Sequence, residues 1–248
     1  MNKGFDLTGQ RVLITGAGGT LGGATARACA AMGGDLVLVD LKAPQALADE
    51  LAAAGATVRA HALDSTDAAA VDALVAGLGT LDALADVAGI YAGGDWLAGG
   101  EGWDALLDRT MDVNVKGPVN LMRAVLPRMM KQGWGRIALT TSLAGRNAGT
   151  TLATEPAYVA SKGALQALVR YFARQSAAHG VVVNAVAPGP INTPMTRASG
   201  QPFDFDRLPT RRFGEPAEIG WPMAFLCSQG CTYMTGVVID VNGGQHFS

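Results

Sequence analysis

Short apolar segments alternate with alanine-rich helical segments along the whole chain, and this alternation restricts the possible folds more than any other feature. Each apolar segment is apolar throughout rather than at every second residue, which is typical of parallel strands covered on both faces. Strands are predicted at residues 11–15, 35–40, 57–63, 81–87, 135–142, 181–187 and 237–241. Helices are predicted at residues 21–32, 45–54, 67–78, 103–111, 115–131, 156–179 and 215–227.

This order predicts an α/β fold: a single-domain, Rossmann-type, doubly wound parallel seven-stranded sheet with helices on both faces, spanning residues 1–248. Apolar residues make up 49% of the chain and charged residues 16%, as expected for a deeply buried sheet. The net charge is -2 without runs of like charge, which argues against nucleic-acid binding. Neither a signal-peptide core nor an apolar run of about 18 residues is present, so we expect a cytoplasmic protein with no membrane partner.

The cysteines and histidines do not form a recognisable metal or disulfide pattern. Cys227 and Cys231 lie four residues apart on a predicted helix, and Cys29 is distant from both. An odd, sparse set of cysteines is more typical of small apolar packing residues than of a disulfide framework. The three histidines, which are His61, His179 and His246, are scattered along the sequence. We therefore expect no metal.

A glycine-rich segment joins the first predicted strand to the first predicted helix. It reads Thr15-Gly16-Ala17-Gly18-Gly19-Thr20-Leu21-Gly22. Glycines let the backbone approach a pyrophosphate closely, and the helix N-terminus offers N–H groups and positive potential. An ordinary tight turn is the alternative, but the strand–loop–helix context favours a dinucleotide site.

Asp40 ends the second predicted strand. An acid at this position accepts hydrogen bonds from the adenosine ribose hydroxyls and repels a 2′-phosphate. No arginine follows it immediately, although Lys42 is close. The sequence therefore favours NAD over NADP.

Two polar residues on the long predicted helix are candidates for proton transfer. Tyr158 and Lys162 are four residues apart and share a face. Thr154 is a candidate N-cap, and Pro156 suits the first turn. An ammonium group and the positive end of a helix should lower the pKa of Tyr158, making it a plausible general acid/base. From spacing alone, packing beside a solvated lysine is the simpler interpretation.

Two further polar residues lie near predicted element ends. Ser142 ends the fifth strand, at the sheet edge where ligands bind in open α/β folds. Asn114 opens the stretch Asn114-Val115-Lys116-Gly117. Each also suits a structural capping role.

Together these motifs resemble the short-chain dehydrogenase/reductase family over nearly the whole chain. The resemblance adds segments 210–219 and 236–244 near the C-terminus. It implies hydride transfer between C4 of a nicotinamide and a secondary alcohol or ketone. It also implies a homotetramer or homodimer, to which residues 235–247 would contribute. The matching residues are Thr15 to Gly22, Asp64, Ala88-Gly89, Asn114, Ser142, Tyr158 with Lys162, and Pro188-Gly189-Pro190-Ile191-Asn192-Thr193.

The resemblance also implies a role for each matching residue. Tyr158 would be the general acid/base, and Lys162 would bind the nicotinamide ribose and lower the tyrosine pKa. Ser142 would orient the substrate oxygen, and Asn114 would hold a water in a proton relay. Asp64 and Ser65 would face the adenine, and Ile191 and Thr193 the nicotinamide amide. The cofactor-binding set is Gly16, Gly19, Thr20, Leu21, Gly22, Asp40, Asp64, Ser65, Ala88, Gly89, Tyr158, Lys162, Pro188, Ile191 and Thr193. The substrate set is Ser142, Leu143, Tyr158 and Met195.

The chain departs from the family pattern at three places. Thr20 replaces a glycine, so the loop is shifted or gains a phosphate contact. Asp86 and Val87 replace two asparagines, so the side-chain bracing of the sheet must be rebuilt. The 16-residue interval from Ser142 to Tyr158 is longer than the family's usual one, which leaves Thr141 as an alternative to Ser142.

The candidate pocket residues are mostly apolar or aromatic, and they favour an apolar or aryl-bearing substrate. A segment at about 190–212 would be a lid that excludes water on closing. Packing of the lid over the cofactor is the simpler role for some of these side chains. The set is Tyr91, Trp96, Leu143, Thr150, Leu152, Met195, Phe203 and Phe205.

Two alternatives remain. One is a 3-oxoacyl-thioester reductase that docks a carrier protein on Arg128, Lys131 and Arg136, against which Asp40 argues. The other is a non-catalytic dinucleotide sensor, which the departures at Thr20 and Asp86 favour. Retention of the four candidate catalytic residues argues against a sensor.

Overall fold

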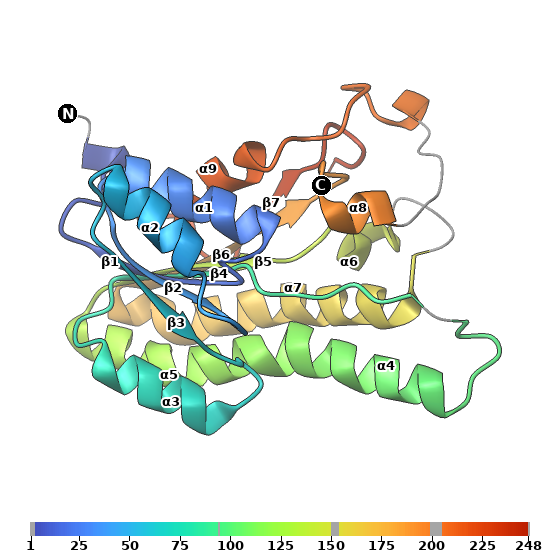
Figure 1. The fold of residues 1–248 in the computed structure, drawn as a ribbon, viewed down its shortest axis with the longest axis horizontal. Helices are drawn as coiled ribbons and strands as arrows, with labels where there is room; N and C mark the ends of the chain where they lie inside the picture. Colours follow the sequence, from blue (N-terminus) through green and yellow to red (C-terminus); the bar gives the residue numbers. More distant parts are fainter. Residues whose placement is uncertain (1–2, 94, 150–153, 199–204, 248) are drawn as a thin grey trace.

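A single parallel sheet runs through the centre of the computed structural model, which describes residues 3–93, 95–149, 154–198 and 205–247 (Figure 1). Its strand order is β3-β2-β1-β4-β5-β6-β7, so the direction of winding reverses between β1 and β4. Ligands bind at such a reversal in open α/β sheets. The predicted doubly wound sheet is confirmed. Its strands are β1 (Arg11–Thr15), β2 (Asp35–Asp40), β3 (Val58–Ala62), β4 (Ala83–Asp86), β5 (Gly135–Thr140), β6 (Val181–Pro188) and β7 (Val238–Val241).

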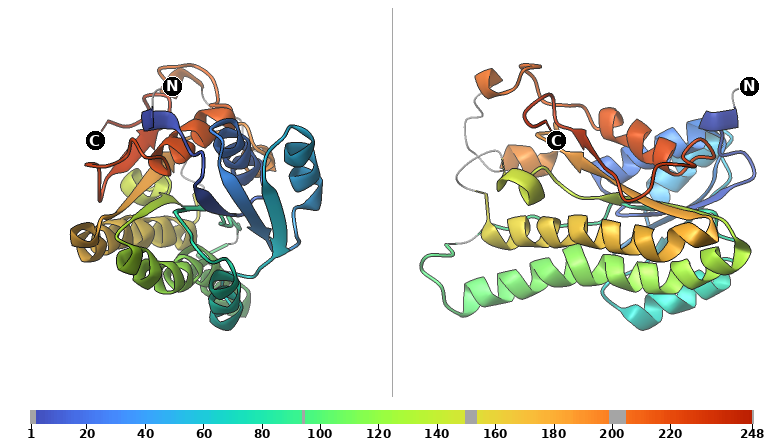
Figure 2. Two further views of the ribbon diagram at one scale, coloured as in Figure 1. Left: turned by 90° about the vertical axis from the view of Figure 1, so that its left-hand side faces the viewer. Right: turned by 180° about the vertical axis from the view of Figure 1, so that it is seen from behind.

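Helices cover both faces of the sheet (Figures 1 and 2). One face carries α1 (Thr20–Ala31), α2 (Gln45–Ala53) and α9 (Ala217–Leu226). The other carries α3 (Ala68–Gly77), α4 (Glu101–Met111), α5 (Gly117–Gln132) and α7 (Pro156–Ser176). Two short helices, α6 (Ala144–Asn147) and α8 (Pro194–Ala198), lie at the carboxyl end of the sheet.

The apolar core is divided by the sheet into two clusters. Val12 and Ile14 of β1 pack toward α1 and α9, whereas Leu13 between them packs toward α5 and α7. All three side chains are fully buried. Because both faces of each central strand are covered, these strands are apolar throughout.

Helix ends differ in how well the sequence predicts them. Asp67 caps α3, which begins one residue after the predicted helix start, since its carboxylate accepts hydrogen bonds from the N–H groups of Ala69 and Ala70 at 2.9 and 3.0 Å. Pro156 opens α7 as expected. The prediction that Thr154 caps α7 is wrong, because the chain enters the helix one residue later, at Glu155, without a side-chain cap.

The predicted break between the fourth and fifth helices is also wrong. Instead α4 continues into α5 through a π-helical turn, η2 (Asp112–Lys116), which contains Asn114. Single π turns inside helices are frequently found at functional sites.

The three cysteines are buried free thiols, which confirms their packing role. Cys227 ends α9 and Cys231 lies beyond it, so the prediction of one helix carrying both is wrong. Among the described residues, no cluster of three or more His, Cys, Asp or Glu side chains is arranged to hold a metal. Within the same ranges, no helix has the length and apolar character needed to cross a membrane.

Candidate active site

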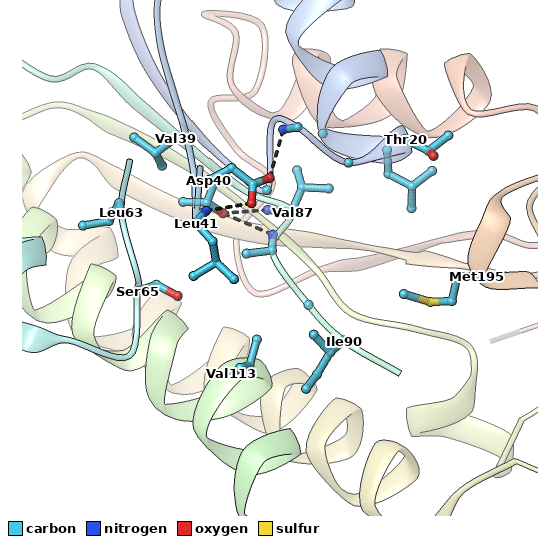
Figure 3. A pocket seen from close by; sticks show the side chains of 18 of the residues that line it. Thr20, Val39, Asp40, Leu41, Leu63, Ser65, Val87, Ile90, Val113 and Met195 are labelled. Carbon is cyan, nitrogen blue, oxygen red and sulfur yellow. Dashed lines mark hydrogen bonds between the residues drawn. The ribbon is translucent and has the colours of Figure 1, made fainter. Parts of the chain in front are cut away.

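A cleft of about 530 Å³ opens at the carboxyl edge of the sheet, beside the point where winding reverses (Figure 3). Loops after β1, β2, β3 and β4 form most of it, and α4 and α8 close its far side. Eleven of the fifteen predicted cofactor residues and Met195 line it: Gly16, Gly19, Thr20, Leu21, Gly22, Asp40, Asp64, Ser65, Ala88, Gly89 and Thr193.

The glycine loop follows β1 so closely that two of its residues have no room for a side chain. Gly16 has φ of 61°, and a Cβ there would lie 2.8 Å from the Ala88 nitrogen. A Cβ on Gly22 would overlap the carbonyl oxygen of Gly16. Helix α1 begins after Gly19, which has no side chain to cap it. The N–H groups of its first turn can therefore bind an anion, and the loop fits a dinucleotide pyrophosphate.

Replacing Gly22 by alanine is expected to weaken cofactor binding by about 10–100-fold. The added Cβ forces the backbone of the loop to move, at a cost of about 1–3 kcal/mol. Gly77→Ala is the control, because a Cβ at that helical glycine meets nothing within 4 Å. Calorimetric titration with the dinucleotide measures both. Equal affinity in the two variants would contradict a pyrophosphate role for the loop.

Asp40 lies at the edge of the cleft where the adenosine ribose of a dinucleotide would bind. Its carboxylate accepts hydrogen bonds from the N–H groups of Gly18 at 2.9 Å and Leu41 at 2.7 Å (Figure 3). The carboxylate is thus fixed in orientation and faces the cleft, where negative charge disfavours a phosphate.

The adenine end of the cleft combines polar residues with an apolar lining. Asp64 accepts hydrogen bonds from the N–H and hydroxyl of Thr66, at 2.9 and 2.7 Å, which fixes the loop after β3. Sequence reasoning missed the apolar lining, whose members lie at strand ends or on the continuous helix and have no motif. Val39, Leu41, Leu63, Val87, Ile90 and Val113 belong to it, together with the cation Arg109.

A smaller cavity of about 140 Å³ adjoins the cleft and contains the predicted reaction centre. Ser142, Tyr158, Lys162, Pro188 and Ile191 line it, together with Thr193 and Met195. The structure thus brings all the predicted cofactor residues to two adjoining pockets. Sequence reasoning missed Thr140 and Thr196 of this cavity, whereas it named Thr141 and Gly189, which also line it.

Ser142 and Thr141 differ in the hydrogen bonds that their hydroxyls make. The Thr141 hydroxyl donates to the carbonyl oxygen of Val186 on β6 at 3.0 Å. The Ser142 hydroxyl instead accepts from the N–H of Ala144 at 3.1 Å, and Ser142 lines the cavity together with Tyr158. Gln166 of α7, which the sequence did not single out, donates from Nε2 to the Ser142 carbonyl at 2.9 Å. The geometry therefore favours Ser142 over Thr141.

Lys162 is buried beside Tyr158 on the first turns of α7. Its Nζ donates to the carbonyl oxygen of Thr140 at 3.0 Å and lies 5.8 Å from the centroid of the Tyr158 ring. A Cβ on Gly89 would lie 3.2 Å from this Nζ and 3.3 Å from Oδ1 of Asn114. Lysine, asparagine and the glycine after β4 therefore meet at one point.

Asn114 is fully buried and lines neither pocket. Its Oδ1 accepts from the N–H of Ile90 at 2.8 Å, and its Nδ2 donates to the Ile90 carbonyl at 2.9 Å. Nδ2 also lies 3.1 Å from the hydroxyl of Ser161 on α7. The π turn therefore ties the loop after β4 to helix α7.

Burial dominates the electrostatics of the reaction centre. Burial raises the pKa of Tyr158, and the Ser142 hydrogen bond offsets only part of this rise. Burial also lowers the pKa of Lys162 to about 8, against the opposing charge of Asp86. The expectation that the protein's own groups lower the Tyr158 pKa is therefore wrong, because desolvation of the phenolate outweighs them.

The departure at Asp86 is accommodated by a hydrogen bond to β1. The Thr15 hydroxyl donates to Asp86 and accepts from the N–H groups of Val87 and Ala88, at 3.1 and 3.2 Å. The bracing of the sheet is thus rebuilt between a carboxylate and a hydroxyl, as the loss of the asparagines required.

The predicted substrate residues are only partly assembled. Met195 lines both pockets, and the ring of Tyr91 lies edge-on to Tyr158 at 5.1 Å. Leu143, which the sequence places in the substrate set, is buried and lines neither of these two pockets. Trp96 is half-exposed and likewise lines neither pocket, and Phe205 packs on Phe213. Thr150, Leu152 and Phe203 lie outside the described residues.

Comparison with known proteins agrees with this arrangement. Residues 16–246 match a family described as enoyl-(acyl carrier protein) reductase. Oxidoreductase UcpA of Salmonella typhimurium is 35% identical over 96% of this chain and 95% of its own. Galactitol 2-dehydrogenase (L-tagatose-forming) of Cereibacter sphaeroides is 37% identical over 97% and 96%. A solved Agrobacterium tumefaciens structure with bound NADP is 31% identical, covers 99% of both chains and has a TM-score of 0.89.

The cleft and the similarity to these relatives over nearly the whole chain together identify an oxidoreductase that uses a nicotinamide dinucleotide. The chain belongs to the short-chain dehydrogenase/reductase family.

Proposed function

We propose that this chain is an NAD-dependent dehydrogenase that interconverts a secondary alcohol and a ketone, with Tyr158 as the general acid/base. The observation that carries the proposal is the placement of Ser142, Tyr158 and Lys162 together in a cavity that adjoins the dinucleotide cleft. Hydride transfer is the chemistry that the bound nicotinamide would supply. The protein supplies position, a dry cavity and a route for the proton.

Each reaction-centre residue has a distinct proposed role. Ser142 orients the substrate oxygen toward the Tyr158 hydroxyl, which gives up or takes the proton. Lys162 holds the nicotinamide ribose, and its ammonium favours the phenolate when charge develops there. Asn114 fixes the loop after β4 through the oxygen and the nitrogen of its side-chain amide and, as the family resemblance implies, holds a relay water.

NAD rather than NADP is proposed because of Asp40. Its carboxylate is held toward the cleft by two backbone N–H groups and would repel a 2′-phosphate. Because a similar structure contains bound NADP, a preference for NADP is the competing hypothesis.

We propose an apolar or aryl-bearing substrate. Ile90, Ile191 and Met195 line the catalytic cavity, and the ring of Tyr91 lies against Tyr158. The segment 190–212 is proposed as a lid, with its ends tied together where Asn192 donates to the Gly214 carbonyl at 2.8 Å. The galactitol 2-dehydrogenase relative supports a polyol as the competing substrate class.

An acyl-thioester reductase is the second candidate, favoured by the description of the matching family. One of the three residues expected to dock a carrier protein is not available at the surface. Arg136 is buried, with its guanidinium 3.5 Å from the centroid of the Trp134 ring, so it cannot meet a carrier protein. Inhibition of a ketoester assay by acidic carrier protein would favour this candidate over a free alcohol substrate.

A non-catalytic dinucleotide sensor is the alternative from a different class. The assembled Tyr158, Ser142 and Lys162 cluster argues against it. We also propose, from family membership, a homodimer or homotetramer to which residues 235–247 contribute, where Val237 and Phe247 expose apolar side chains.

The proposal is tested by following nicotinamide absorbance with NAD and NADP separately. The alcohol panel should contain aryl ethanols, aliphatic secondary alcohols, galactitol and a hydroxy acid. We expect reduction of NAD with the aryl ethanols. Fast turnover of the polyol without activity on aryl alcohols would contradict the apolar substrate. Tight NAD binding without turnover of any member would favour the sensor.

A further inference from the structure

Asp86 is a buried acid that the proposed chemistry does not use. It ends β4 at the carboxyl edge of the sheet and is only 2% exposed. Its carboxylate accepts a hydrogen bond from the Thr15 hydroxyl. Neutral donors do not cancel the charge of a carboxylate, so a buried acid at this position calls for a positive neighbour.

The sheet register brings Lys162 to the same spot. Asp86 lies opposite Leu139 in the β4–β5 ladder, and the Lys162 ammonium donates to the carbonyl of the next residue, Thr140. Adjacent strands are about 4.8 Å apart. Gly89, three residues after Asp86, also lies against this ammonium, because a Cβ added to it would lie 3.2 Å from Nζ. Both charges are therefore enclosed between the ends of β4 and β5 and helix α7.

The other groups around this ammonium do not neutralise it. Thr140 offers a carbonyl from β5, and Asn114 of the π turn is a neutral amide. Tyr158 on α7 is a neutral phenol whose pKa is raised. The nearby Tyr91 contributes to this rise in the Tyr158 pKa. The charged residues Asp40, Asp64 and Arg109 line the dinucleotide cleft instead. Asp86 is the charged group whose field acts on Lys162, and Lys162 acts on Asp86 in return.

We propose that Asp86 is the buried counterion of Lys162, a positioning residue that keeps the ammonium charged and aimed at the reaction centre. The structure supports a simpler role as well, since Asp86 braces β1 against β4 through Thr15. Asparagine would brace the strands equally well but would carry no charge. The two roles therefore separate in the Asp86→Asn variant.

The test is the titration of Lys162 in the free protein, followed by NMR with ¹³Cε-labelled lysine. The chain contains only Lys3, Lys42, Lys116, Lys131 and Lys162, so few signals need assignment, and Lys162→Arg identifies the relevant one. Wild-type Lys162 should titrate near 8. In Asp86→Asn the midpoint should fall by about one pH unit or more, because loss of a nearby negative charge disfavours the ammonium. An unchanged midpoint would overturn the proposal.

A matched variant controls for the loss of any buried acid. Asp240 of β7 is a mostly buried carboxylate paired with Arg146 at 3.1 Å. Asp240→Asn should leave the Lys162 midpoint where it is in the wild type. A shift of similar size in both variants would assign the effect to general destabilisation and overturn the proposal.

A reciprocal measurement decides the case if Asp86→Asn does not fold. Burial raises the pKa of Asp86 to about 6, and the charge of Lys162 opposes this rise. Lys162→Met should therefore raise the Asp86 midpoint further, as seen with ¹³Cγ-labelled aspartate. No rise would exclude the electrostatic interaction between Asp86 and Lys162.

The catalytic consequence rests on the proposed function and has its own readout. In Asp86→Asn, the alkaline limb of the kcat/KM profile for alcohol oxidation should move to lower pH by the same amount as the Lys162 midpoint. A moved Lys162 midpoint in a protein that oxidises no alcohol would support Asp86 as the counterion of Lys162 and reject the proposed function. Alcohol oxidation with an unmoved Lys162 midpoint would keep the proposed function and reject Asp86 as the counterion of Lys162.

Discussion

Replacing Tyr158 by phenylalanine is expected to lower kcat for alcohol oxidation by about 10²–10⁴-fold, the range in which a positioned general acid/base contributes. The ring keeps its place against Tyr91, and only the hydroxyl is lost from the cavity that Tyr158 shares with Ser142. Cofactor affinity should change little, because the glycine loop and Asp40 are untouched. Steady-state kinetics with NAD, together with calorimetric titration of NAD, measure the two quantities.

Tyr171→Phe is the matched control for this variant. Tyr171 lies on the same helix, thirteen residues further along and exposed, with its ring against Phe172. Its loss of a hydroxyl should leave kcat within about 2-fold of the wild type, as for surface substitutions. Unchanged turnover in Tyr158→Phe would contradict the role of Tyr158 as general acid/base and would favour the non-catalytic dinucleotide sensor.

The layered fold is predictable from the sequence because strands buried on both faces appear as continuous apolar runs. Continuous apolar runs at residues 11–15 and 35–40 coincide residue for residue with β1 and β2. The fifth strand ends two residues before its predicted end, at Thr140. The two residues beyond it turn toward the cavity and β6, and this depends on contacts that neighbouring sequence does not encode.

The candidate site is predictable where a residue type is demanded by backbone geometry or charge. Gly16 and Gly22 are needed because any Cβ would meet backbone atoms. Other features depend on packing between distant segments. The π turn that buries Asn114 arises from contacts among α4, α5 and α7, and the burial of Arg136 follows from its position under Trp134. Neither has a local signal.

The Tyr158 pKa illustrates the limit of motif-based electrostatics. The spacing of Tyr158 and Lys162 correctly predicts that they share a face, and an ammonium nearby should favour a phenolate. The depth of burial, which spacing does not reveal, reverses the direction of the shift. A charge-based argument from sequence therefore needs the degree of desolvation before its sign can be assigned.

Replacing Asp40 by alanine is expected to shift cofactor preference from NAD toward NADP by about 10–100-fold in the ratio of kcat/KM values. Two like charges about 4 Å apart repel by about 4 kcal/mol in a partly exposed site, and salt and solvent reduce this to roughly 1.4–2.8 kcal/mol. Steady-state kinetics with each dinucleotide at low and high salt measure the ratio. The preference for NAD should weaken at high salt in the wild type and not in the variant.

Asp40→Asn separates repulsion from hydrogen bonding. The asparagine carbonyl can still accept from the Gly18 N–H, which Asp40 binds at 2.9 Å, but it carries no charge. Activity with NADP should therefore rise in both variants, whereas activity with NAD should fall mainly in Asp40→Ala, which also loses the acceptor for the ribose hydroxyls. Equal ratios in Asp40→Asn and the wild type would show that the carboxylate does not select the cofactor. A wild-type preference for NADP would contradict the proposed NAD dependence at once, and would make the carrier-linked ketoreductase the leading candidate.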